Sequence, residues 1–235
     1  MPRTAVEASV PQLREPRYSQ SLERGLSILG CYTPDRRVLG VAEVADELGM
    51  SRSTTHRYMS TLVVLGYLEQ VQARRYRLGL RVTDLGMSAL NATGVGEHAR
   101  PYLEELSLLV SYSVSLAVLD APEIVLVERL PSRRLREGDR FGHSLRAGSR
   151  LPSYCTAMGK VLLASSRFEL AELLDGGRLK CRGPNTITSR KRLREELERV
   201  RSDGLAMSHQ ELVLGRSAIA VPVKDATEEV VAAVG

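Results

Sequence analysis

Hydroxyl, imidazole and guanidinium side chains dominate residues 51–60, within one short stretch of the chain. Such groups donate hydrogen bonds to the base edges of DNA and to phosphate oxygens. At 100° per residue, Ser53, Arg57 and Ser60 lie on one side of a helix, flanked by Thr54 and His56. The stretch therefore predicts a DNA-reading face, whose candidate residues are Ser51, Arg52, Ser53, Thr54, His56, Arg57 and Ser60.

Two short helices must hold that face, and the sequence carries signals for both. The first has apolar residues at i, i+3, i+4 and i+7, namely Val41, Val44, Ala45 and Leu48. Gly49 follows where a helix often ends in the left-handed conformation, and Ser51 is placed to cap the second helix. The inward side of the second helix is formed by Thr55, Tyr58, Met59, Leu62 and Leu65. This order predicts a helix-turn-helix.

The neighbouring segments support the same unit. Residues 67–78 contain two short strand-like runs, with Arg74 and Arg75 near the bend, and predict a basic wing that contacts phosphate. Residues 19–32 begin at a serine and carry four apolar side chains, which predicts a first helix that packs on the other two. The alternative is an ordinary surface helical hairpin with no nucleic-acid partner.

Composition favours an intracellular binding protein of one or two domains. The chain has 235 residues, a net charge of +5 and a pI near 9.3. Residues 1–82 hold 12 basic against 8 acidic side chains, whereas residues 83–235 hold 21 against 20. The basic excess therefore lies with the predicted DNA-reading unit, where a polyanion would bind.

Several other classes of protein are disfavoured. Three unpaired cysteines argue against a disulfide framework, and the four histidines form no metal-ligand motif with them. A nucleophilic role for Cys155, helped by His143 or His209, lacks an orienting third group, and no P-loop or nucleophile elbow occurs. No signal peptide or membrane-spanning run is found. We expect a cytoplasmic protein that is not an enzyme and needs no cofactor.

The chain divides into four parts by composition and periodicity. We expect a disordered tail over 1–17, the DNA-binding domain over 18–80, a linker helix and hinge over 81–96, and a second domain over 97–235. In the second domain, short strands around a few helices without regular βαβ alternation predict an α+β fold with a mainly antiparallel sheet. The last apolar run stops at Gly235, so we expect this domain to continue in the natural protein.

The chain resembles the IclR-type bacterial transcriptional regulators over residues 18–235. The matching stretches are YSQSLERGLSIL, VAEVADELGMSRSTTHRYMSTLVVLGYLE, YRLGLRVTDLG, LPSYCTAMGKVLLA and GLAMSHQELVLGRSAIAVPVKD. The resemblance implies a winged helix-turn-helix, a linker helix, a GAF-like effector-binding domain and a homodimer or homotetramer. VERLPSRR and SHQEL are similar to the branch that governs catabolism of protocatechuate, 4-hydroxybenzoate and β-ketoadipate.

The resemblance also implies where an effector binds, at the start of the helix that begins near Thr156. Free N–H groups and the helix dipole favour an anion there. Ala157, Met158, Ser208 and Ala218 match family positions in the pocket. The side-chain chemistry adds Glu211, which could shape the pocket, and Arg133 with its neighbour Arg134, which could bind a carboxylate.

Two functions follow from these features. The first is a regulator that binds a near-palindromic DNA operator and is controlled by a small organic acid, the acid biasing the spacing of the DNA heads through residues 84–96. The second is a small-molecule-binding or enzymatic domain whose N-terminal helices serve protein association. The sequence is compatible with activation and with repression, and with several effectors.

Overall fold

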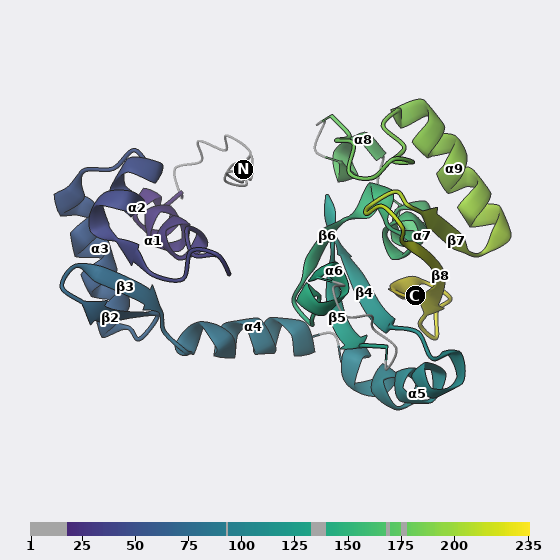
Figure 1. Cartoon of the computed structure of the whole chain (residues 1–235), viewed down its shortest axis with the longest axis horizontal. Helices are drawn as coiled ribbons and strands as arrows, with labels where there is room; N and C mark the ends of the chain where they lie inside the picture. The colour runs from purple at the N-terminus through teal and green to yellow at the C-terminus, as the bar shows by residue number, and fades with distance from the viewer. Residues whose placement is uncertain (1–17, 93, 133–139, 168–169, 175–177) are drawn as a thin grey trace. The chain divides into compact units, whose positions relative to one another are not determined.

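The computed structural model describes residues 18–92, 94–132, 140–167, 170–174 and 178–235. The predicted tail over 1–17 lies outside these residues. Contacts along the chain divide it into two compact units between Ser88 and Ala89 (Figure 1). No helix in the described ranges is long and apolar enough to cross a membrane.

The first unit packs three helices on a small antiparallel sheet with strand order β1-β3-β2. Its elements are α1 (Gln20–Gly30), β1 (Leu39–Gly40), α2 (Val41–Glu47), α3 (Arg52–Val64), β2 (Leu68–Gln72) and β3 (Arg75–Leu78). Ile28, Val44, Met59, Leu68 and Tyr76 are buried and bring all three helices and the hairpin into one core. The predicted helix-turn-helix and strand pair are therefore present in the predicted order.

Local signals set the helix ends as predicted, with one difference. Gly49 adopts φ +62°, and the Ser51 hydroxyl caps α3 by accepting a hydrogen bond from the Thr54 N–H at 3.1 Å. Ser19 caps α1 in the same way. Leu65, predicted to face inward, is 45% exposed because it lies at the C-cap, where the helix periodicity no longer holds it against the core.

Helix α4 (Arg81–Asn91) spans the boundary between the units and has no buried residue. Helix α5 (Val95–Val110) follows Gly94, which adopts φ +63°. Helix α5 therefore begins two residues before Glu97, where the second domain was predicted to begin. Gly96 is buried against the sheet, where a Cβ would approach Val127 Cγ1 to 2.8 Å, so this glycine permits close helix packing.

The second unit contains a six-stranded sheet with order β6-β5-β4-β9-β8-β7, in which every pairing is antiparallel. The strands are β4 (Val114–Asp120), β5 (Glu123–Leu130), β6 (Arg150–Pro152), β7 (Ala206–His209), β8 (Ser217–Lys224) and β9 (Val230–Val234). The predicted α+β class with an antiparallel sheet is confirmed.

Helices cover the two faces of this sheet with separate cores. On one face α5 packs through Leu103 against Val114, Leu116, Val127 and Ala232. On the other, α7 (Ala157–Ser165) packs against the sheet and against α9 (Arg190–Asp203) (Figure 1). Two short helices, α6 (Arg140–Ser144) and α8 (Leu170–Leu173), contribute Phe141 and Leu170 to the core on this second face.

Residues Arg140–Ser144 form the short helix α6. Phe141 and Leu145, which pack against the α7 core, are four residues apart. That spacing suits one turn of helix as well as a strand, so the sequence alone does not distinguish the two periods here.

Candidate functional site

The predicted DNA-reading face lies on α3, and most of it is open to solvent. Ser53, His56 and Arg57 are exposed, whereas Thr54 and Ser60 are partly buried. Thr55, Met59 and Leu62 are buried on the opposite side of the helix. The exposed Arg57 guanidinium lies 5.9 Å from the ring centre of Tyr58.

The start of α3 has a structural task besides any contact with DNA. The Ser51 hydroxyl accepts from the Thr54 N–H and donates to Thr54 Oγ1 at 2.8 Å. It also lies 3.1 Å from Ser53 Oγ. Ser51 and Thr54 therefore hold the helix end, while Arg52 beside them is exposed and free to approach phosphate.

The two arginines of the predicted wing differ. Arg74, at φ +57° in the turn between β2 and β3, pairs with no carboxylate among the residues that the structure describes. Arg75 donates to the Val38 carbonyl at 3.2 Å and lies 3.6 Å from the Glu43 carboxylate at the start of α2. Arg74 is therefore the more available phosphate contact, and Arg75 ties the wing to α2.

In the second unit, the start of α7 offers unsatisfied backbone donors. Thr156 caps the helix through its hydroxyl, which accepts from the Gly159 N–H at 3.2 Å. The N–H groups of Ala157 and Met158 make no hydrogen bond within the described ranges. Ala157 is buried and Met158 is partly buried. This helix end therefore presents two donors and the positive end of a dipole.

Strands β7 and β8 bring two further predicted residues to the same side of the sheet. Ser208 and Ala218 are direct neighbours across the ladder, and the buried pair Ala206 and Ala220 lies two residues along. The buried Ser208 hydroxyl donates to the Cys155 carbonyl at 3.2 Å, just before α7. Ala218 is exposed although it shares this core-facing side. Ser208 therefore links β7 to the segment just before α7, with Ala218 beside it on β8.

Glu211 lies in a buried ion-pair network with two other side chains. Its Oε1 accepts from Lys160 Nζ at 2.8 Å, and Lys160 donates equally closely to Glu196. Lys160 and Glu211 are 1% and 6% exposed. Glu211 Oε2 has no partner among the described atoms. Glu211 therefore anchors the loop after β7 to α7 rather than presenting a free carboxylate.

The second predicted basic pair, Arg133 and Arg134, lies outside the described residues. The structure instead shows Arg129, which sequence reasoning missed, near the end of β5. Its guanidinium donates to Ser115 Oγ at 2.9 Å, to Ser113 Oγ at 3.4 Å and to the Gly142 carbonyl at 3.3 Å. An arginine in a mainly apolar strand, next to Glu128, was the available signal, but its side of the sheet depends on strand register.

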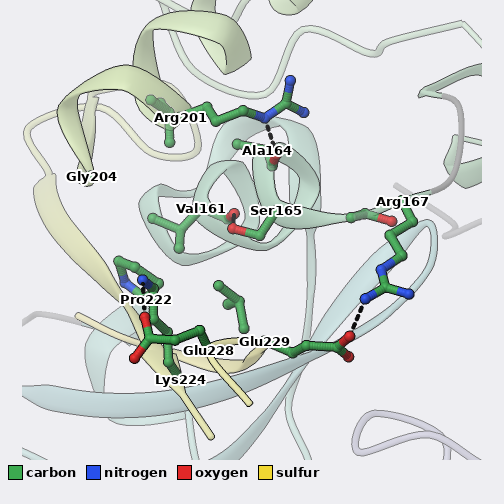
Figure 2. A pocket seen from close by; sticks show the side chains of 13 residues that line it. Val161, Ala164, Ser165, Arg167, Arg201, Gly204, Pro222, Lys224, Glu228 and Glu229 are labelled. Carbon is green, nitrogen blue, oxygen red and sulfur yellow. Dashed lines mark hydrogen bonds and ion pairs between the residues drawn. The ribbon is translucent and has the colours of Figure 1, made fainter. Parts of the chain in front are cut away.

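A cavity of about 670 Å³ lies at the opposite, C-terminal end of α7 (Figure 2). Arg167 pairs with Glu229, and Lys224 with Glu228, across its rim. None of the predicted effector residues lines it. The carbonyl end of a helix disfavours an anion. Two of the three basic side chains that line the cavity pair with Glu229 and Glu228, and the third, Arg201, donates to the Ala164 carbonyl at 2.8 Å. The physical chemistry of acid binding therefore favours the N-terminal end of α7.

Catalysis has no support in the described residues. Burial raises the pKa of the Cys155 thiol to about 12, so the thiol stays protonated near neutral pH. His209 is engaged with the Ser217 hydroxyl at 2.7 Å. In the ranges that the structure covers, no group of three His, Cys, Asp or Glu side chains could hold a metal ion.

Comparisons with known proteins match both the helix-turn-helix unit and the second unit. Residues 21–72 match the IclR helix-turn-helix domain, and residues 87–235 match the C-terminal domain of the bacterial transcriptional regulator IclR. The Pca regulon regulatory protein of Pseudomonas putida is 33% identical over 93% of this chain and 74% of its own length. The p-hydroxybenzoate hydroxylase transcriptional activator of Acinetobacter baylyi is 35% identical over 96% and 83%.

A solved structure of similar fold carries a ligand. It is an IclR homolog from Microbacterium hydrocarbonoxydans in complex with 4-hydroxybenzoate, 27% identical to this chain. The alignment covers 91% of this chain and 87% of that one, with a TM-score of 0.77.

Proposed function

The chain belongs to the IclR family of bacterial transcriptional regulators, and we propose that a small aromatic or dicarboxylic acid controls its action on DNA. The observation that carries the proposal is the convergence at the start of α7, where two free N–H donors, the Ser208 hydroxyl and apolar side chains meet. Two relatives named for the Pca regulon and for p-hydroxybenzoate hydroxylase support the class of acid.

The family is one of DNA-binding regulators, and α3 supplies the surface for that contact. In our proposal α3 enters the major groove with Arg57 at the centre of its outer face, because guanidinium can donate two hydrogen bonds to guanine. Arg74 contacts phosphate from the wing. The relatives are regulators rather than enzymes, which agrees with the protonated, buried thiol of Cys155.

A second copy of the chain supports specific binding in this proposal. One recognition helix reads only a few base pairs, so a near-palindromic operator needs two heads about one helical turn apart. Helix α1 exposes Leu22 and Leu26 at 64% and 59%, on the side away from the buried Ile28. We assign this apolar surface of α1 to contact with its copy in a homodimer, which can assemble further into a homotetramer.

The acid acts through linkage between the two units. A ligand that binds one conformation of the second unit more tightly shifts the population of DNA-competent dimers. Helix α4 carries that shift because it spans the boundary and has no buried residue that fixes it to either core. The first compounds to test are protocatechuate, 4-hydroxybenzoate and β-ketoadipate.

The experiment combines mobility shift on DNA flanking the gene with thermal unfolding in the presence of each acid. A specific acid should change the retarded fraction and raise the melting temperature once its concentration exceeds the dissociation constant. Ala218→Phe should abolish the thermal shift, whereas the control Ile219→Phe, on the opposite and exposed face of β8, should retain it. Unchanged thermal shifts in Ala218→Phe would place the acid elsewhere.

A further inference from the structure

One guanidinium beside the proposed effector site is held only by neutral groups. Arg129 donates to two serine hydroxyls and one backbone carbonyl, at 2.9 to 3.4 Å. Its Nε is buried and has no acceptor among the described residues. Burial, followed by repulsion from Arg216, lowers the pKa of Arg129. No carboxylate in the described ranges offsets this charge.

A bulge in the sheet turns Arg129 toward α7. Leu116 pairs with Glu128 but Ala117 pairs with Leu126, so Val127 is an extra residue in β5. Beyond the bulge, Arg129 pairs with Ser115 and shares the face of Ala117, which belongs to the α7 core. Without the extra residue, the strict alternation of a strand would turn Arg129 to the α5 face.

Short contacts connect Arg129 with the proposed effector site. Ser115, which accepts from Arg129, exchanges backbone hydrogen bonds with Gly235 at 2.7 and 3.0 Å. A Cβ placed on Gly235 would lie 3.0 Å from Met158 Cγ. Two residues, Ser115 and Gly235, therefore link Arg129 to the start of α7.

A second basic residue borders the same cluster. The Arg216 guanidinium lies 5.4 Å from the ring centre of Phe141. Phe141 precedes Gly142, whose carbonyl accepts from Arg129. Arg216 lies directly before β8 and two residues before Ala218 in the chain. A second positive charge therefore lies near Phe141 and Gly142, beside the Arg129 guanidinium.

We propose that Arg129 anchors the carboxylate of the effector, with Ser113 and Ser115 holding the guanidinium ready for it. This inference rests on the proposed function, in which the effector is an acid. A carboxylate accepts two parallel N–H bonds from a guanidinium, and it would provide the acceptor that Nε lacks. The serine hydroxyls accept from Arg129 and keep their own protons to donate to the same ligand.

The test compares 4-hydroxybenzoate with its neutral isostere 4-hydroxybenzamide by isothermal titration. The unaltered protein should bind the acid at least 10-fold more tightly than the amide. Arg129→Gln should weaken the acid roughly 10- to 100-fold and leave the amide within about threefold, which removes the discrimination. The control Arg100→Gln lies on α5 among Glu104 and Glu128 and should change neither affinity.

A second measurement follows Arg129 directly in the unaltered protein, with its side chain present. In nitrogen-15 NMR of the unaltered protein, the Nε–H resonance of Arg129, identified by its absence in Arg129→Lys, should shift on adding the acid but not the amide. The role of Arg129 is overturned if the acid binds without shifting the Nε–H resonance, or if Arg129→Gln binds the acid as tightly as the unaltered protein. Either result leaves the proposed function, control by an acid, in place. If the unaltered protein binds none of the proposed acids, the proposed function itself fails.

Discussion

Replacing Lys160 with methionine tests the buried ion-pair network that joins α7 to α9 and to the loop after β7. Lys160 is 1% exposed and donates at 2.8 Å to both Glu196 and Glu211. Methionine fills most of the volume but leaves the Glu211 carboxylate buried without its cation. Breaking a buried pair by removing one partner typically costs about 3–5 kcal/mol, because the remaining charge stays desolvated. We expect a loss of that order in the free energy of unfolding.

The assay is urea unfolding followed by far-ultraviolet circular dichroism, with thermal melting in parallel. A loss of this size corresponds to a fall of roughly 6–20 °C for a unit of about 150 residues. The matched control is Lys224→Met, since Lys224 pairs with Glu228 at 2.8 Å but is 48% exposed. An exposed pair contributes about 0–1 kcal/mol.

A double variant separates the lost charge from the lost packing. Lys160→Met combined with Glu211→Leu removes both charges of the Lys160–Glu211 pair, and we expect it to recover most of the stability lost in Lys160→Met alone. If Lys160→Met unfolds no more easily than Lys224→Met, the buried network contributes little. The reasoning from burial would then be refuted.

Three further predictions concern DNA and assembly. Arg57→Ala should lose roughly 1–3 kcal/mol of specific affinity in a mobility-shift titration while the circular dichroism spectrum is preserved; unchanged affinity would mean that another face of α3 reads DNA. Arg74→Ala should reduce the slope of log K against log salt by about one unit, and Arg75→Ala by less, since Arg75 already pairs with Glu43; equal reductions would contradict this ranking. Leu26→Arg should shift the light-scattering mass toward a monomer and weaken operator binding; a dimer of normal affinity would exclude the α1 interface.

The DNA-binding unit was predictable because its signals are local. A left-handed Gly49, a capping Ser51 and apolar residues at helical spacing each act within a few positions, and the structure realises all three. Sequence did not separate Arg74 from Arg75, since their difference depends on Glu43, which is 32 residues from Arg75 in the chain. Local propensity determines which helices and strands form. Contacts between residues distant in the sequence determine which side chains remain available to contact DNA.

The start of α5 was mispredicted because the role of its glycine depends on a distant contact. Two glycines around Val95 resemble a flexible joint when only the chain is read. Yet Gly96 is required by close packing against the sheet, because a Cβ at this position would clash with Val127. The sequence alone does not distinguish a glycine that allows close packing from one that allows the backbone to bend.

The missed arginine shows the limit of strand periodicity at the effector site. Alternation from Ile124 and Leu126, both in the α7 core, would place Glu128 on that face and Arg129 on the other. The bulge reverses this, so Glu128 faces α5 and lies 3.6 Å from Arg100, while Arg129 joins Ser115. A single inserted residue therefore exchanges a carboxylate for a guanidinium beside α7. An acid would be repelled by the first arrangement and bound by the second, so the specificity of this site depends on the register of two strands.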